Sequence, residues 1–130
     1  MPATQTALTI SAVNAFAVAT IAAATATRSI TANTRDERGW VTAEVAPTVS
    51  LAGDRVTLSV PENFYATSKI SREILAAAKA AVIEAFSTAG LTVHLQVRKQ
   101  NGAKISVETC GFWHMGQWCV KSRYMVWRIA

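Results

Sequence analysis

The chain has 130 residues, of which 51% are hydrophobic, so it is long enough to form one domain with a buried core. Its formal net charge is +5, and all of it lies in residues 98–130, where six basic residues accompany the single acid Glu108. Two cysteines are too few for a disulfide framework, which excludes a small cross-linked scaffold.

The first 27 residues carry no charged side chain and are mostly Ala and Thr. They lack the basic start of a secretory signal, and their Thr, Ser and Asn residues dilute any membrane span. We therefore interpret this segment as an arm packed against protein, either its own sheet or a neighbouring copy, with a membrane span or a processed segment as alternatives. The charged residues of 28–39 are typical of a linker. We assign 1–34 to the arm and linker and 35–130 to a single α+β domain.

Two strands and a helix are predicted next. Residues 40–49 and 55–60 alternate between apolar and polar side chains, and prolines interrupt or end both segments. Residues 68–89 have apolar side chains three and four positions apart, and Gly90 supplies a common helix stop. This pattern predicts an amphipathic helix that packs on a sheet.

Three further strands are predicted after that helix. Residues 91–97 and 104–108 each alternate with a period of two. A two-residue Asn-Gly turn between them would place a core residue opposite a solvent-facing one. We therefore predict a three-residue loop over 100–102, which pairs Val97 with Ile105.

The last hairpin is predicted to turn at His114–Met115. This register sets Cys110 opposite Cys119 and places Trp118 and Tyr124 on the buried face. The complete order is β-β-α-β-β-β after the arm. It predicts an α+β fold with one antiparallel sheet and a helix packed on one face.

The other face of the predicted sheet is basic and is bordered by aromatic side chains. Lys and Arg neutralise phosphates, and exposed rings stack on bases, so this surface favours nucleic acid as a partner. The alternative is an ordinary solvated face that keeps the protein soluble. The predicted nucleic-acid-binding residues are Arg98, Lys104, Lys121, Arg123 and Trp127.

No motif in the sequence indicates a reaction. His94 and Glu108 are predicted neighbours across two strands, but an exposed pair of this kind is typical of a simple polar contact. Cys110, Cys119 and His114 have an unfamiliar spacing for a metal site. We predict no catalytic residue, no metal site and no cofactor.

The sequence therefore predicts a non-enzymatic structural protein that assembles into a homo-oligomer through its arm and presents a basic sheet face to nucleic acid, in the cytoplasm or a virion. Its size, basicity and low charged fraction are similar, in a general way, to those of small viral coat proteins. The alternative is an extracytoplasmic domain that the apolar arm tethers to a membrane, with a Cys110–Cys119 disulfide.

Overall fold

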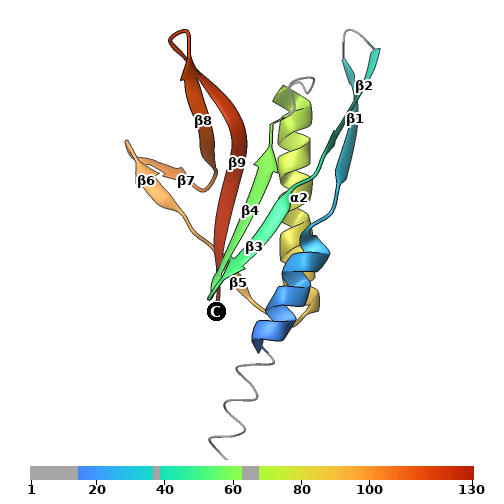
Figure 1. Cartoon of the computed structure of the whole chain (residues 1–130), viewed down its shortest axis with the longest axis vertical. Helices are drawn as coiled ribbons and strands as arrows, with labels where there is room; N and C mark the ends of the chain where they lie inside the picture. The colour runs from blue at the N-terminus through green and yellow to red at the C-terminus, as the bar shows by residue number, and fades with distance from the viewer. Residues whose placement is uncertain (1–14, 37–38, 63–67) are drawn as a thin grey trace, which may run out of the picture.

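The computed structural model describes residues 15–36, 39–62 and 68–130 (Figure 1). A helix over residues 15–26 comes first, and the long helix α2 (Ser68–Thr88) lies between the fourth and fifth strands. The strands are β1 (Ile30–Asp36), β2 (Gly39–Val45), β3 (Thr48–Ala52), β4 (Arg55–Pro61), β5 (Val93–Leu95), β6 (Arg98–Gln100), β7 (Ala103–Ile105), β8 (Glu108–His114) and β9 (Gln117–Ile129).

The main sheet is organised around β9, the longest strand. Its order is β3-β4-β9-β5, and β8 pairs with the first half of β9. The hairpins β1–β2 and β6–β7 form separate two-stranded ladders, and every pairing among the described strands is antiparallel. The predicted α+β class, with a helix packed against a sheet, is confirmed, although the described strands divide into three sheets rather than one.

Helix α2 covers the inner face of the main sheet (Figure 1). Its apolar residues recur every four positions, so they form one stripe that is buried against β4 and β9. The helix ends at Thr88, and Gly90 follows it with a φ of 78°, which is the left-handed conformation. The amide of Gly90 donates to the carbonyl of Ser87, and that of Leu91 donates to the carbonyl of Phe86, both at 2.9 Å. The stripe consists of Ile70, Ile74, Ala78, Val82 and Phe86.

The helix over residues 15–26 contributes a face of alanines to the same hydrophobic core. Ala19, Ala22, Ala23 and Ala26 are all buried in it. Within the described ranges, no helix is both long and apolar enough to cross a membrane. The first 14 residues of the predicted arm lie outside the described part of the chain.

Most of the predicted linker is instead a β-strand. Residues Ile30–Asp36 form β1, which pairs with β2 so that the buried Ala32 lies opposite the buried Ala43. The charged residues of this segment concealed its alternation. The hairpin lies beside α2, on the side away from β8 and β9 (Figure 1).

The predicted three-residue loop over 100–102 is wrong. The turn has two residues, Asn101 and Gly102, with φ values of 50° and 79°. Positive φ at both positions is typical of the two-residue hairpin turns that favour Asn-Gly. Arg98 therefore pairs with Ile105. The error arose because β6 and β7 leave the main sheet, so the requirement that partners share one buried face does not apply to them.

The predicted turn at His114–Met115 is also wrong, by one residue. Met115 and Gly116 form the turn, and His114 pairs with Gln117. Further along, Gly111 pairs with Val120 and Cys110 with Ser122, so Lys121 is the extra residue of a β-bulge.

The shifted turn and the bulge change which residues face each other. Cys119 lies opposite Phe112 rather than Cys110, and both cysteines are free thiols. Trp127, predicted on the outer face, is 1% exposed in the core, whereas Trp118, predicted in the core, is 44% exposed.

Candidate nucleic-acid interface

The outer face of the main sheet turns away from α2. On β9, Met125 and Trp127 are buried on the inner side, so the alternate residues Tyr124, Val126 and Arg128 belong to the outer side. The neighbouring outer positions of β4 are Thr57 and Ser59, which lie opposite Val126 and Tyr124. This face is therefore mixed in polarity and only partly covered.

A row of basic side chains crosses three strands at one end of this face. Arg55 of β4 pairs with Arg128 of β9, and Arg128 pairs with His94 of β5. All three residues are exposed. Directly opposed residues have Cβ atoms about 4.5–5.5 Å apart, so the two guanidinium groups repel each other. Within the described ranges, neither Arg55 nor Arg128 has an ion-pair partner.

A second pair of like charges lies on the β6–β7 hairpin. Lys99 and Lys104 are directly opposed and both are exposed. Their neighbours along the strands, Arg98 and Ile105, line a cleft against the main sheet, so the two lysines lie on the hairpin's other side. The hairpin thus carries a second pair of opposed, exposed cations.

The cleft between this hairpin and β9 has a volume of about 220 Å³. Strand β9 contributes Tyr124 and Val126 to it. Its remaining lining residues are Gln96, Val97, Arg98, Ile105, Ser106 and Glu108.

A hydrogen-bonded group fixes one wall of the cleft. The hydroxyl of Tyr124 donates to Oε2 of Glu108 at 2.7 Å, and Nε of Arg98 donates to Oε1 of the same carboxylate. The hydrogen bonds from Tyr124 and then from Arg98 lower the pKa of Glu108 below its ordinary value. The same hydrogen bond raises the pKa of Tyr124, because ionisation would remove the proton that the phenol donates and would place a phenolate beside the carboxylate of Glu108.

The five predicted binding residues are not brought together as one site. Arg98 forms an ion pair with Glu108, and Arg123 forms one with Glu62. Trp127 is buried, so its predicted place on the outer face is wrong. Lys104 and Lys121 are exposed, the first on the hairpin and the second in the bulge of β9.

Sequence reasoning missed Arg55 and Arg128 as members of one cluster. They are 73 positions apart, and only the β4–β9 pairing makes them neighbours. No local pattern carries that pairing, because the two strands are separated by α2 and four further strands.

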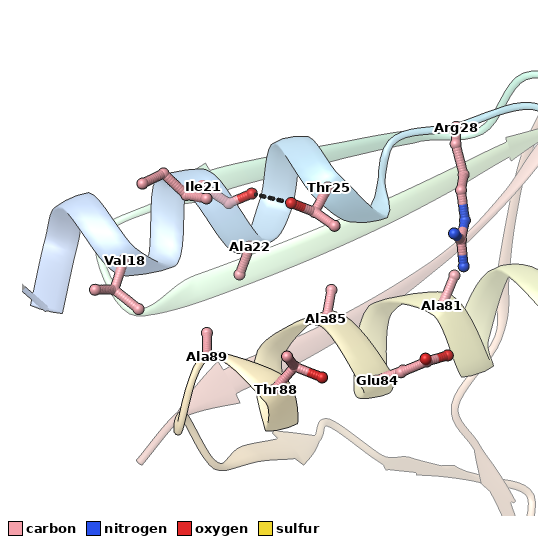
Figure 2. Close-up of a pocket in the computed structure, with 10 residues that line it drawn as sticks. All are labelled: Val18, Ile21, Ala22, Thr25, Arg28, Ala81, Glu84, Ala85, Thr88 and Ala89. Carbon is pink, nitrogen blue, oxygen red and sulfur yellow. Dashed lines mark hydrogen bonds between the residues drawn. The ribbon is translucent and has the colours of Figure 1, made fainter.

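Large apolar side chains are also exposed elsewhere, among them Trp40 of β2 at 75%. The tip of the β8–β9 hairpin projects beyond the sheet (Figure 1). It carries the exposed side chains of Trp113, Met115 and Trp118, and the ring centroids of Trp113 and Trp118 lie 5.5 Å apart in an edge-to-face contact. A groove of about 430 Å³ lies between the helix over residues 15–26 and the C-terminal half of α2 (Figure 2).

The groove is lined mainly by small and apolar side chains. Ala85 and Ala89 face Val18 and Ala22 across it, and Arg28 reaches toward α2 at one end (Figure 2). Ile21, which also lines the groove, is 66% exposed. Exposed apolar surface of this kind marks candidate contacts with other protein surfaces.

Among the described residues, no three or more His, Cys, Asp or Glu side chains form a cluster that could hold a metal ion.

Comparison of the chain with protein-family models, with curated proteins and with solved structures found no match.

Proposed function

We propose that this protein is a non-enzymatic, self-assembling structural protein whose outer sheet face binds nucleic acid, as a coat or packaging component would. The observation that carries the proposal is the row formed by Arg55, Arg128 and His94. Opposed cations on adjacent strands destabilise a sheet. A polyanion bound across the row would offset this repulsion, because its phosphates neutralise the guanidinium groups.

The surroundings of the row support a polyanion rather than a single small anion. Lys99 and Lys104 extend the positive charge onto the hairpin, and Lys121 lies further along β9. Several separated cations suit a strand with regularly spaced phosphates.

Binding of a fluorescent single-stranded oligonucleotide, followed by anisotropy at low salt, tests this half of the proposal. The wild-type protein should bind, and the double variant Arg55→Gln/Arg128→Gln should bind more weakly. Lys69→Gln/Arg72→Gln is the matched control, because it removes the same charge from exposed positions of α2. Absence of wild-type binding, or an equal loss in both double variants, would contradict the proposal.

Self-assembly is supported by the apolar side chain of Ile21, which lines the helix groove and is 66% exposed. Light scattering should give a particle larger than one chain for the wild type and a smaller one for Ile21→Glu. Thr20→Glu adds the same charge to the same helix at an exposed position that does not line the groove, so it should leave the size unchanged. A monomeric wild-type protein would refute self-assembly.

A further inference from the structure

The cleft beneath the β6–β7 hairpin opens on the same sheet face as the basic row. Tyr124, Val126 and Arg128 are successive outer-face residues of β9, so the cleft begins one outer position away from the row. Residues two positions apart on a strand are separated by about 7 Å. Gln96 also joins the cleft to the row. Its backbone amide donates to the carbonyl of Val126 at 2.8 Å, and it lines the cleft two positions after His94.

The size of the cleft limits what it can hold. Pockets that enclose a whole drug-sized ligand measure about 300–1,000 Å³. At about 220 Å³ this cleft takes a smaller group, such as one planar ring system. The adjacent row provides the charge that such a group's phosphate would need.

The chemistry of the walls suits a heterocyclic base. The phenol ring of Tyr124 and the side chains of Val126 and Ile105 offer apolar contact. Ser106 can donate and accept hydrogen bonds, and so can Gln96, whose Nε2 also donates to the carbonyl of His94 at 3.4 Å. The bonds of Tyr124 and Arg98 to Glu108 hold this wall in place before any ligand arrives. A preordered wall reduces the conformational entropy lost on binding.

We propose that this cleft accommodates one unstacked base of a single-stranded nucleic acid whose phosphates lie along Arg55, Arg128 and His94. The inference rests on the proposed function, since it assigns a base-binding subsite to the same face. Single strands suit the cleft because their bases are free to leave the stack, whereas a duplex holds them in pairs.

The experiment compares a short single-stranded oligonucleotide with its abasic counterpart, which has the same number of phosphates. Contact of one base with an aromatic platform should make the wild-type protein bind the base-bearing strand about tenfold more tightly than the abasic strand. Ser106→Leu fills the cleft, so it should bring this ratio close to one while the affinity for the abasic strand stays unchanged.

Ser50→Leu is the matched control, because it adds the same side chain to an exposed position of β3 on the outer face, away from the cleft. It should retain the wild-type ratio. Gln96→Ala removes a polar wall without adding bulk, so it should lower the ratio even if Ser106→Leu disturbs the fold. Thermal unfolding of each variant identifies any such disturbance.

The outcomes separate the two proposals. Binding of neither strand would remove the proposed function and the base subsite together. Equal binding of both strands by the wild type would leave the phosphate interface standing and overturn the base subsite. A wild-type ratio that survives both Ser106→Leu and Gln96→Ala would place the bound base elsewhere and also overturn it.

Discussion

The two faces of β9 carry different side chains because they meet different surroundings. Met125 and Trp127 point toward α2 and are almost completely buried, whereas Tyr124, Val126 and Arg128 lie on the outer side, where Arg128 is exposed. The inner face removes large apolar groups from water and so supplies much of the free energy of folding.

The outer face breaks a rule that the inner face obeys. It places two arginines directly opposite each other, which costs stability and contributes nothing to packing. A local violation of this kind, on an otherwise consistent fold, points to a role in binding. The comparison teaches that side-chain alternation alone lets one strand pack on one face and leave the other face to the binding role that we propose.

Trp127→Ala should cause the largest loss of stability. Removing a fully buried aromatic side chain costs about 3–5 kcal/mol. The side chain of Trp127 is 1% exposed, and its partners on the neighbouring strands are Val56 and Leu95. Val126→Ala, one residue away on the outer face, should cost about 1 kcal/mol or less. Urea unfolding measures both. Similar losses for the two variants would contradict the assignment of the faces.

Gly111→Ala should cost about 1–3 kcal/mol, because it overpacks the β-bulge that sets the faces of β9. A Cβ atom at Gly111 would lie 2.1 Å from the backbone carbonyl oxygen of Cys119, which cannot move without disturbing the ladder. Cys110→Ala is the control, since its side chain is exposed, and it should change stability by at most about 0.5 kcal/mol. Thermal unfolding that shows no difference between the two would argue against the bulge.

Arg128→Gln should stabilise the protein slightly, by about 0.2–1 kcal/mol, since it relieves repulsion between opposed cations. The gain should shrink at about 1 M salt, where the Debye length is only about 3 Å. Denaturant unfolding at low and high salt measures it. A loss of stability at low salt would mean that the guanidinium group of Arg128 is stabilised by its surroundings.

Glu108 should make stability depend on pH in the acid range. Its pKa is lowered in the folded state, so the unfolded chain binds more protons there, and stability falls as the pH falls. The difference in free energy of unfolding between wild type and Glu108→Gln should be largest above the ordinary pKa of 4.5 and should shrink as the pH falls from about 5 to about 3. A difference that is constant over this range would show that Glu108 has no special contacts.

Local signals in the sequence predicted α2 and the alternation of β4 well. The apolar spacing and Gly90 fixed the helix to within a residue at each end, because both are properties of neighbouring residues. The inner positions of β4 were identified from their period of two, and all three are buried.

The faces of the C-terminal strands could not be obtained in this way. The turn at Met115–Gly116 differs from the predicted one by one residue, which changes the partner of each β8 residue by two positions and leaves the alternation of faces as predicted. The bulge at Lys121 inserts one residue and so moves the side chains of the rest of β9 to the other face. Gly111 lies close to the backbone of Cys119 beside this bulge, a contact that only the folded backbone shows. The basic row depends on contacts between strands that are distant in sequence.

The salt dependence of nucleic-acid binding tests the central claim, that the outer face contacts phosphates through its basic row. For a single-stranded oligonucleotide, each lost phosphate contact should reduce the slope of log K against log salt by about 0.7. Arg55→Gln/Arg128→Gln should therefore have a slope about 1.4 units shallower than that of the wild type, and Lys69→Gln/Arg72→Gln should retain the wild-type slope. Equal slopes for the row variant and the wild type would contradict the account.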